Sequence, residues 1–115
     1  MNRLTNLFKI LSDETRLRIL VLLFQERCCV CELCGVLNVS QPKISKGLSK
    51  LKDLGIVADE RKEKFVYYSL KSEDRALLGI MKNIVENIDA YPQLAEDRKN
   101  LSDKEKFSSQ CCPSY

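Results

Sequence analysis

The sequence predicts a mainly α-helical (α+β) fold, a winged helix-turn-helix whose wing is a two-stranded β-hairpin. Apolar residues recur at helical spacing through much of the first half of the chain. A short predicted helix is joined to the next one by the tight link Asn38-Val39-Ser40, which is the pattern of a helix-turn-helix unit. Two β-prone runs follow directly, and a hairpin in this place turns the unit into a winged helix.

Four helices are predicted ahead of the hairpin. The second, at about residues 14–25, follows a cap at Ser12 or Asp13 and is apolar on several sides, which predicts a central position. The third covers about residues 31–37, and the fourth follows the N-cap Ser40 and ends near position 54. The first helix has an apolar stripe made of Leu4, Leu7, Phe8 and Leu11.

The wing is predicted from two runs rich in β-branched and aromatic residues, at 56–58 and 65–68. The charged residues 59–64 between them are expected to form the tip of the hairpin. Helical spacing returns from Glu73, and Pro92 is expected to end this last helix. Its apolar stripe consists of Leu77, Ile80, Met81, Ile84 and Ile88.

We expect one folded domain and a tail. Residues 1–91 are predicted to form a DNA-binding and dimerisation domain, and residues 92–115 a polar, flexible C-terminal tail that contains Cys111-Cys112. A chain of 115 residues buries a modest core, so that dimerisation would stabilise it. The stripes of the first and last helices are the predicted homodimer surface: Leu4, Leu7, Phe8, Leu77, Ile80, Met81, Ile84 and Ile88.

Composition indicates a soluble cytoplasmic protein that does not enter a membrane. Hydrophobic residues make up 44% and charged residues 30% of the chain. No apolar run approaches the ~18 residues of a membrane span, and none resembles a secretory leader. In the cytoplasm all six cysteines are expected to be thiols.

The fourth helix carries the features of a DNA-reading helix. Lysines on its polar face can neutralise phosphates, and short polar side chains let a helix approach the major groove. Gln41 lies near its N-terminal end, where side chains reach base edges, and can pair with adenine. The predicted DNA-binding residues are Ser40, Gln41, Lys43, Ser45, Lys46, Ser49 and Lys50, with Arg61, Lys62 and Lys64 at the wing tip.

A second motif is the cysteine cluster Cys29-Val30-Cys31-Glu32-Leu33-Cys34. Cys31 and Cys34 share one helix face, whereas in an unbroken helix Cys29 would point roughly the opposite way from Cys31. The three sulfur atoms can therefore converge only if the chain at Cys29 is not helical. The helix N-terminus and Arg27 are expected to lower the pKa of these thiols.

Sulfur ligands without histidine select soft, thiophilic ions, and three sulfur atoms suit trivalent arsenic or antimony. Zinc would require a fourth ligand. The predicted effector site is thus Cys29, Cys31 and Cys34 with As(III) or Sb(III), and no organic cofactor is expected. Cys28, Cys111 and Cys112 are possible additional ligands whose roles stay open.

The same motifs resemble the ArsR/SmtB family of winged-helix repressors, in its arsenical-responsive branch. The matching segments are Leu17-Arg18-Ile19-Leu20, the cysteine cluster, Ser40-Gln41-Pro42-Lys43-Ile44-Ser45 and Val66-Tyr67-Tyr68. This resemblance implies a homodimeric repressor that binds an operator and leaves it when As(III) or Sb(III) binds Cys29, Cys31 and Cys34. Gly47 stands where many relatives have histidine, which we expect to remove one DNA-side contact.

Three other functions agree with parts of the pattern. A repressor of the same fold could respond to thiol oxidation, or to Cd(II), Pb(II) or Bi(III), because soft ligands overlap in preference. A cysteine-based metal carrier without a DNA role is the alternative outside transcription, and the lysine-rich fourth helix argues against it. No enzymatic activity is expected, since a cysteine nucleophile normally needs a base and histidine is absent.

Overall fold

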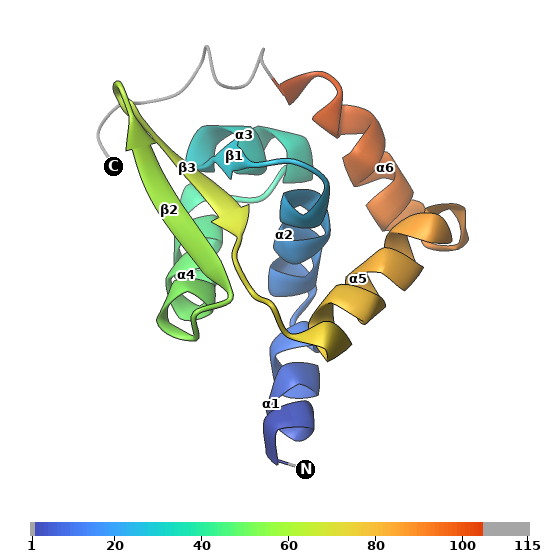
Figure 1. The fold of residues 1–115 in the computed structure, drawn as a ribbon. Coiled ribbons are helices and arrows are strands. Elements are labelled where there is room, and N and C mark those ends of the chain that lie inside the picture. The colour runs from blue at the N-terminus through green and yellow to red at the C-terminus, as the bar shows by residue number, and fades with distance from the viewer. Residues whose placement is uncertain (1, 105–115) are drawn as a thin grey trace.

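The computed structural model describes residues 2–104 and shows helices packed around α2 (Glu14–Gln25), with a small antiparallel sheet at one side of the molecule (Figure 1). Cys111 and Cys112 lie outside the described residues. None of the helices in residues 2–104 is long and apolar enough to cross a membrane. The elements in chain order are α1 (Asn2–Leu11), α2 (Glu14–Gln25), β1 (Cys28–Cys29), α3 (Val30–Leu37), α4 (Gln41–Asp53), β2 (Val57–Lys62), β3 (Phe65–Leu70), α5 (Arg75–Glu86), the 3-10 helix η1 (Ile88–Ala90) and α6 (Pro92–Leu101).

The helix α2 is the centre of the fold, as its many-sided apolar pattern predicts. Asp13 caps it by accepting a hydrogen bond from the Arg16 amide at 3.0 Å. Ile19, Leu20 and Leu22 are fully buried, and α2 contacts α1, α4, α5, α6 and β3. Elements from both ends of the chain therefore pack on one helix (Figure 1).

The helix-turn-helix unit is confirmed in α3 and α4. Asn38 ends α3 in the left-handed conformation at φ 54°, which short polar side chains tolerate better than most others. Ser40 is the N-cap residue of α4, and Pro42 lies within its first turn. This tight link places α3 against α4, so a shift of α3 would reach the predicted DNA-reading helix.

The wing contains a strand that the sequence pattern did not reveal. β2 and β3 form the predicted antiparallel hairpin, but β1 pairs with the other edge of β3, so the sheet order is β1-β3-β2. Cys28 lies opposite Tyr68 and Cys29 opposite Tyr67. A two-residue strand is too short to show alternation, and its pairing comes from the tertiary fold. The cysteine cluster is thus connected directly to the wing.

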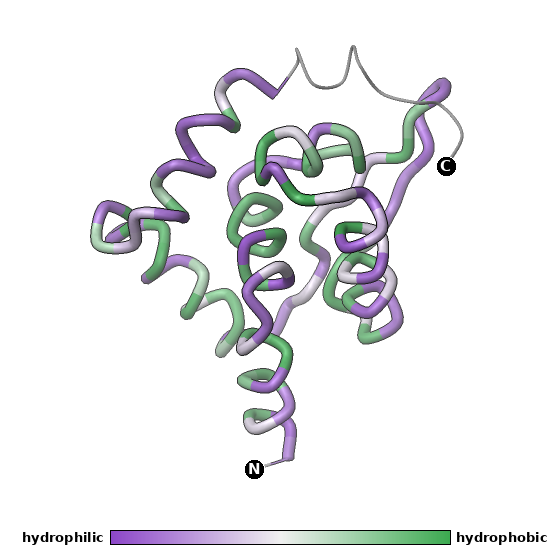
Figure 2. Tube along the Cα trace, turned by 180° about the vertical axis from the view of Figure 1, so that it is seen from behind, coloured by the Kyte–Doolittle hydropathy of each residue, from purple (hydrophilic) through white to green (hydrophobic). Residues whose placement is uncertain are grey.

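The predicted flexible tail is wrong for residues 92–101, which form α6. Pro92 begins this helix instead of ending the previous one, in the first turn where proline is tolerated. Leu94, Asp97 and Leu101 are buried along one face at i, i+3 and i+7. The charges on its other faces hide this narrow stripe, and Figure 2 accordingly shows α6 as mostly hydrophilic.

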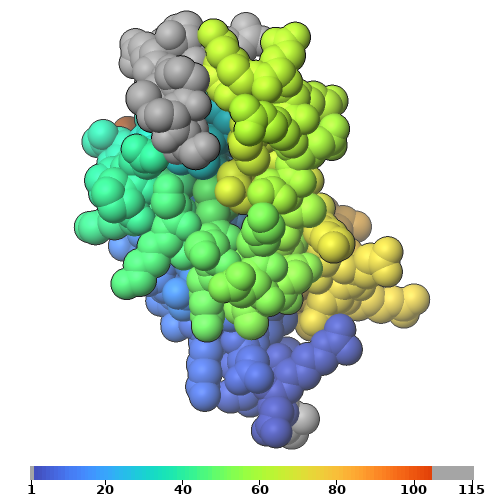
Figure 3. All heavy atoms as spheres, turned by 90° about the vertical axis from the view of Figure 1, so that its left-hand side faces the viewer, coloured from blue at the N-terminus to red at the C-terminus, as the bar shows by residue number. Residues whose placement is uncertain are grey.

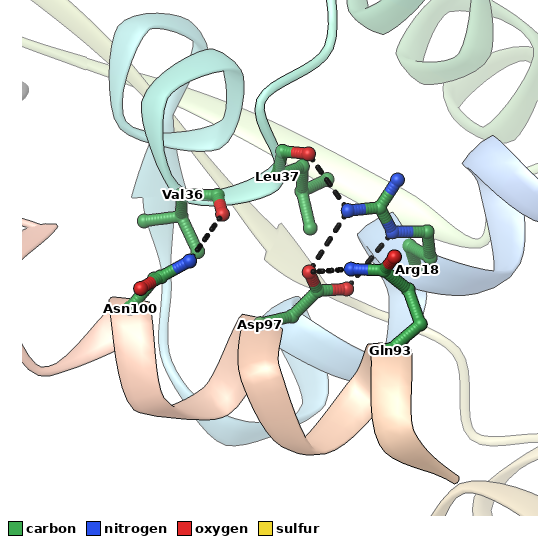
Figure 4. A network of polar contacts seen from close by, with 6 residues as sticks. All are labelled: Arg18, Val36, Leu37, Gln93, Asp97 and Asn100. Carbon is green, nitrogen blue, oxygen red and sulfur yellow. Dashed lines mark hydrogen bonds and ion pairs between the residues drawn. The ribbon is translucent and has the colours of Figure 1, made fainter.

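A buried ion pair fastens α6 to the rest of the fold (Figure 4). Arg18 of α2 donates two hydrogen bonds to the carboxylate of Asp97, both at 2.9 Å. The side chains are 12% and 2% exposed, and Gln93 also donates to Asp97 at 3.1 Å. The hydrogen bonding of Arg18 to the Asp97 carboxylate is the main cause that raises the pKa of Arg18. Two helices that are far apart in sequence are thereby held together.

The predicted dimer surface is wrong for four of its eight residues, because these four side chains pack in the chain's own core. Leu77 and Met81 are fully buried within the subunit, and Leu7 and Ile88 nearly so. Residues at helical spacing on a terminal helix can cover the core or a partner, and spacing alone does not separate the two. On α1, Leu4 and Phe8 remain exposed, and Ile80 and Ile84 on α5 are half-buried.

Candidate nucleic-acid interface and cysteine site

The outer face of α4 is built as a basic, small-residue surface. Ile44, Leu48 and Leu51 are buried against the core and fix which side of the helix faces out. The predicted contact residues are all exposed: Ser40, Gln41, Lys43, Ser45, Lys46, Ser49 and Lys50. This surface has the charge and side-chain size that a major-groove helix requires.

Gly47 does not belong to this outer face, which corrects our expectation of a lost DNA contact. A Cβ atom added at Gly47 would lie 3.1 Å from Ile19 Cδ1 and 3.7 Å from Arg16 Cγ. The position is buried and points toward α2. Glycine here permits close packing of α4 on α2, and the missing side chain is one that would have faced a neighbouring helix.

The wing lies beside α4 on the same face of the molecule (Figure 3). Lys52 of α4 and Asp59 of β2 form an ion pair at 2.8 Å that links the two elements. The hydrogen bond between them raises the pKa of Lys52 and lowers that of Asp59. The predicted wing residues Arg61, Lys62 and Lys64 are exposed at the far end of the hairpin, where they extend the basic surface.

Cys29 lies outside the regular helix, as the sequence predicts for a site at which the three sulfur atoms can converge. It adopts extended backbone at φ −85° and ψ 170° and is the N-cap residue of α3. Its sulfur faces the backbone amide of Glu32, while its own amide donates to Glu32 Oε1 at 3.0 Å. This is a capping box in which cysteine replaces the usual serine or threonine.

The three sulfur atoms are close in sequence but are not gathered as a finished site. Cys29 and Cys34 lie near enough for the charge of one thiolate to raise the pKa of the other. Within residues 2–104, however, no three Cys, Asp or Glu side chains are arranged to hold a metal ion. The sulfur-only donor set fits a thiophilic ion, and binding it would require local rearrangement.

The expectation that every cysteine is a free thiol is wrong for Cys31. Cys31 takes part in a disulfide, whereas Cys28, Cys29 and Cys34 are free. Cys31 is also half-exposed, unlike the buried Cys28 and Cys29. A sulfur atom in a disulfide is not available as a thiolate ligand, so metalloid binding at Cys31 requires prior reduction. The partial exposure of Cys31 favours this reduction, because thiol-disulfide exchange needs access to the sulfur.

The expected lowering of thiol pKa values by the helix N-terminus is wrong for the residues where a shift is resolved. Burial raises the pKa of Cys29, against hydrogen bonds from backbone amides that favour its thiolate. Burial also raises the pKa of Cys34. The guanidinium of Arg27, which was expected to help lower these pKa values, lies over the Tyr67 ring at 5.1 Å from the centroid. Desolvation therefore outweighs the helix dipole here.

Cys28, whose role the sequence left open, is a core residue. Its side chain is fully buried in the main hydrophobic cluster, and its sulfur lies 3.6 Å from the Glu26 carbonyl oxygen. Burial raises its pKa to about 12. A small buried hydrophobe is the ordinary role of cysteine, so we do not include Cys28 among the ligands.

Two charged residues, Glu32 and Lys104, lie beside the cysteines and were not predicted from the sequence. Glu32 is 3% exposed, and the ammonium of Lys104 lies 3.9 Å from its Oε1. Lys104 also pairs with Glu26 at 2.8 Å and donates to the Arg27 carbonyl oxygen at 2.8 Å. Glutamate three residues after a cap is a recognisable signal, whereas nothing in the sequence places Lys104 at this site.

Comparisons with known proteins identify the family. The model of the bacterial regulatory proteins of the arsR family matches residues 13–59, which include α2, α3 and α4. The arsenic resistance transcriptional regulator ArsR2 of Pseudomonas putida is 38% identical over 93% of this chain and 96% of its own length. The arsenical resistance operon repressor of Escherichia coli K12 is 51% identical over 56% of this chain. That match spans 56% of the relative, and the match to ArsR1 of P. putida spans 62%.

Solved structures agree with this assignment. The transcriptional regulator HlyU of Vibrio vulnificus has a TM-score of 0.67 and 33% identity, over 74% of this chain and 86% of that one. The AntR antimony-specific transcriptional repressor has a TM-score of 0.65 and 26% identity, over 80% and 82% of the two chains. The mainly helical winged fold is therefore confirmed. On the near full-length match to ArsR2, this chain belongs to the arsR family of bacterial regulatory proteins.

Proposed function

We propose that the protein is a cytoplasmic transcriptional repressor that binds operator DNA as a homodimer and is released by As(III) or Sb(III). The effector ligands are Cys29, Cys31 and Cys34. The observation that carries the proposal is the extended conformation of Cys29 at the start of α3, which meets the requirement that this residue lie outside the regular helix of Cys31 and Cys34. Relatives named as arsenic resistance regulators and an antimony-specific repressor support the choice of ion.

DNA binding uses the exposed face of α4 and the wing. Two α4 helices related by a two-fold axis would enter successive major grooves ~34 Å apart, so the operator should be an imperfect inverted repeat. In this proposal Gln41 and Ser45 contact base edges, and the exposed lysines contact phosphates. Exposed Leu4 and Phe8, with half-buried Ile80 and Ile84, remain the residues proposed for the dimer contact.

Release begins at the capping box. To bring its sulfur onto an ion shared with Cys31 and Cys34, Cys29 must leave its present place beside the Glu32 amide. That movement can reach DNA by two routes. One runs through the contact of α3 with α4, and the other runs through the pairing of β1 with β3 in the wing. Allosteric couplings of this kind are typically ~1–3 kcal/mol, and DNA must weaken ion binding by the same factor.

Serine variants test this function. Under reducing conditions, Cys29→Ser, Cys31→Ser and Cys34→Ser should each bind operator DNA like the wild type and no longer be released by arsenite. Cys28→Ala is the matched control, since Cys28 is a buried neighbour outside the proposed ligand set, and it should still respond. Fluorescence anisotropy with a labelled operator gives both affinities. Undiminished release of all three serine variants would exclude this cluster as the sensor.

Thiol oxidation is a second candidate signal, which the disulfide at Cys31 favours. If oxidation is the signal, mild peroxide should release the operator and a thiol reductant should restore binding, with arsenite having no effect on the reduced protein. The same anisotropy assay distinguishes the two signals, because the metalloid mechanism requires release from fully reduced protein.

A further inference from the structure

The most unusual feature near the cysteines is a buried carboxylate. Glu32 lies between two proposed ligands in sequence and its side chain is 4% exposed. One oxygen accepts the Cys29 amide hydrogen at 3.0 Å, which fixes the carboxylate at the ligand's own backbone. Because solvent screens a buried charge only weakly, the Glu32 carboxylate would interact strongly with the charge of an ion complex bound at Cys29.

Among residues 2–104, the negative charge of Glu32 is paired with an ammonium that it shares with a second carboxylate. Lys104 is the ammonium paired with it, at 3.9 Å, and the same ammonium is closer to Glu26, at 2.8 Å. Arg27 is exposed and its guanidinium lies over the Tyr67 ring. Two carboxylates therefore share one ammonium next to the cysteine cluster.

Ions that bind three thiols differ in the charge they leave behind. Arsenite, As(OH)₃, exchanges three As–O bonds for three As–S bonds. Each thiol proton leaves on a hydroxyl as water, so the adduct is neutral. A divalent ion such as Pb(II) displaces three protons to solvent and leaves a trithiolate complex with one negative charge. Only the second product is repelled by a neighbouring carboxylate.

We propose that Glu32 is a specificity-determining residue, whose buried carboxylate makes the three-cysteine site favour trivalent ions over divalent ones. The inference rests on the function proposed above, because it takes Cys29, Cys31 and Cys34 as the ligands. Lys104 acts in the opposite direction by partly neutralising Glu32. The division is by ionic charge and not by element, so Sb(III) and Bi(III) belong with As(III), and Cd(II) with Pb(II).

The test compares Pb(II) with As(III) on the same reduced proteins at fixed pH. Glu32→Gln keeps the shape and an oxygen that can accept the Cys29 amide hydrogen, while it removes the charge. We expect its Pb(II) dissociation constant to fall about tenfold, which corresponds to ~1.4 kcal/mol. Its As(III) dissociation constant should stay within about twofold of the wild type. Charge-transfer absorption follows Pb(II) binding, and competition with Pb(II) gives the As(III) affinity.

Two further variants keep the result decisive. Lys104→Met removes the ammonium that partly neutralises Glu32, so it should weaken Pb(II) binding and leave As(III) binding unchanged. This variant tests the effect of the Glu32 charge even if Glu32→Gln does not fold. Glu26→Gln is the matched control: Glu26 shares Lys104 but is 49% exposed, and its effect on Pb(II) should be smaller than that of Glu32→Gln. Calorimetry in buffers of different ionisation enthalpy should show protons released with Pb(II) and none with As(III).

Equal changes in the two affinities would overturn the inference, because they would mean that Glu32 acts on the shape of the site. A Pb(II) affinity that neither Glu32→Gln nor Lys104→Met alters would overturn it as well. Failure of the proposed function has a different signature. In that case Cys34→Ser would bind both ions as tightly as the wild type.

Discussion

The two ends of α3 are held by different kinds of contact. Residues of α6 contact its C-terminal end, and Lys104, which follows α6, contacts its N-terminal end. At the C-terminal end, Arg18 donates to the Leu37 carbonyl oxygen at 2.7 Å and is itself held by Asp97 (Figure 4). Asn100 adds a hydrogen bond to the Val36 carbonyl oxygen at 3.4 Å. At the N-terminal end, Cys29 and Glu32 form a capping box whose carboxylate faces an ammonium 3.9 Å away.

This difference separates a fixed end from an adjustable one. A buried, bidentate guanidinium-carboxylate pair is costly to break, because either partner alone would be left charged and buried. A capping box contributes on the order of 1 kcal/mol and can be exchanged for another interaction. The adjustable end carries the cysteines, and the fixed end adjoins the turn into α4. We infer that an ion bound at Cys29 moves the start of α3 and β1 more than the turn.

The largest predicted effect is at the fixed end. Asp97→Ala should lower the free energy of unfolding by ~3–5 kcal/mol, because it leaves Arg18 buried without its carboxylate. Urea denaturation followed by circular dichroism measures this loss. Glu96→Ala, one residue earlier on the exposed side of α6, is the control and should cost little. If the two variants were equally stable, Asp97 would not anchor α6.

A smaller effect is predicted at the adjustable end. Glu32→Ala removes the acceptor for the Cys29 amide and should cost ~1–2 kcal/mol, the range found for lost helix caps. Because Glu32→Gln keeps an acceptor, it should recover much of that loss in the same denaturation experiment. A cost for Glu32→Ala that matches or exceeds that of Asp97→Ala would contradict the contrast between the two ends.

The smallest effect concerns pH and the buried thiol next to the cluster. The pKa of Cys28 is raised from 9.0 to about 12 by burial, so the unfolded chain loses this proton at lower pH than the folded protein. Its contribution to stability is complete below pH ~9 and is lost as pH rises toward 12. Between pH 8 and pH 10 the wild type should lose ~1 kcal/mol more stability than Cys28→Ala. If the free energy of unfolding of the wild type and of Cys28→Ala fell equally between pH 8 and pH 10, Cys28 would not be the cause of the loss.

Much of the fold could be predicted because its signals are local. Apolar spacing and the caps at Asp13 and Ser40 indicated α1 to α4, and β-prone runs indicated β2 and β3. β1 and α6 were missed for the same physical reason. A two-residue strand has no period, and the face of α6 that contains Leu94 and Leu101 is too narrow among charges to stand out. Both elements depend on tertiary contacts.

The cysteine site also combines features that local sequence spacing predicts with features that depend on the tertiary fold. The spacing of Cys29, Cys31 and Cys34 showed which residues could act together and that Cys29 had to leave the helix. Spacing could not show that burial would raise the thiol pKa values of Cys29 and Cys34. Nor could it bring Lys104 to Glu32, because that contact spans most of the chain. Desolvation and long-range pairing are properties of the folded protein alone.

The most direct test of the sensing role is X-ray absorption at the arsenic edge on reduced protein, recorded beside an operator-binding titration. We expect three sulfur neighbours and no retained oxygen around arsenic in the wild type, with operator release complete at one As(III) per subunit. Cys34→Ser should show at most two sulfur neighbours and keep its operator. Release of DNA by an arsenic atom that has no sulfur from this cluster would show that the three cysteines are not the sensor.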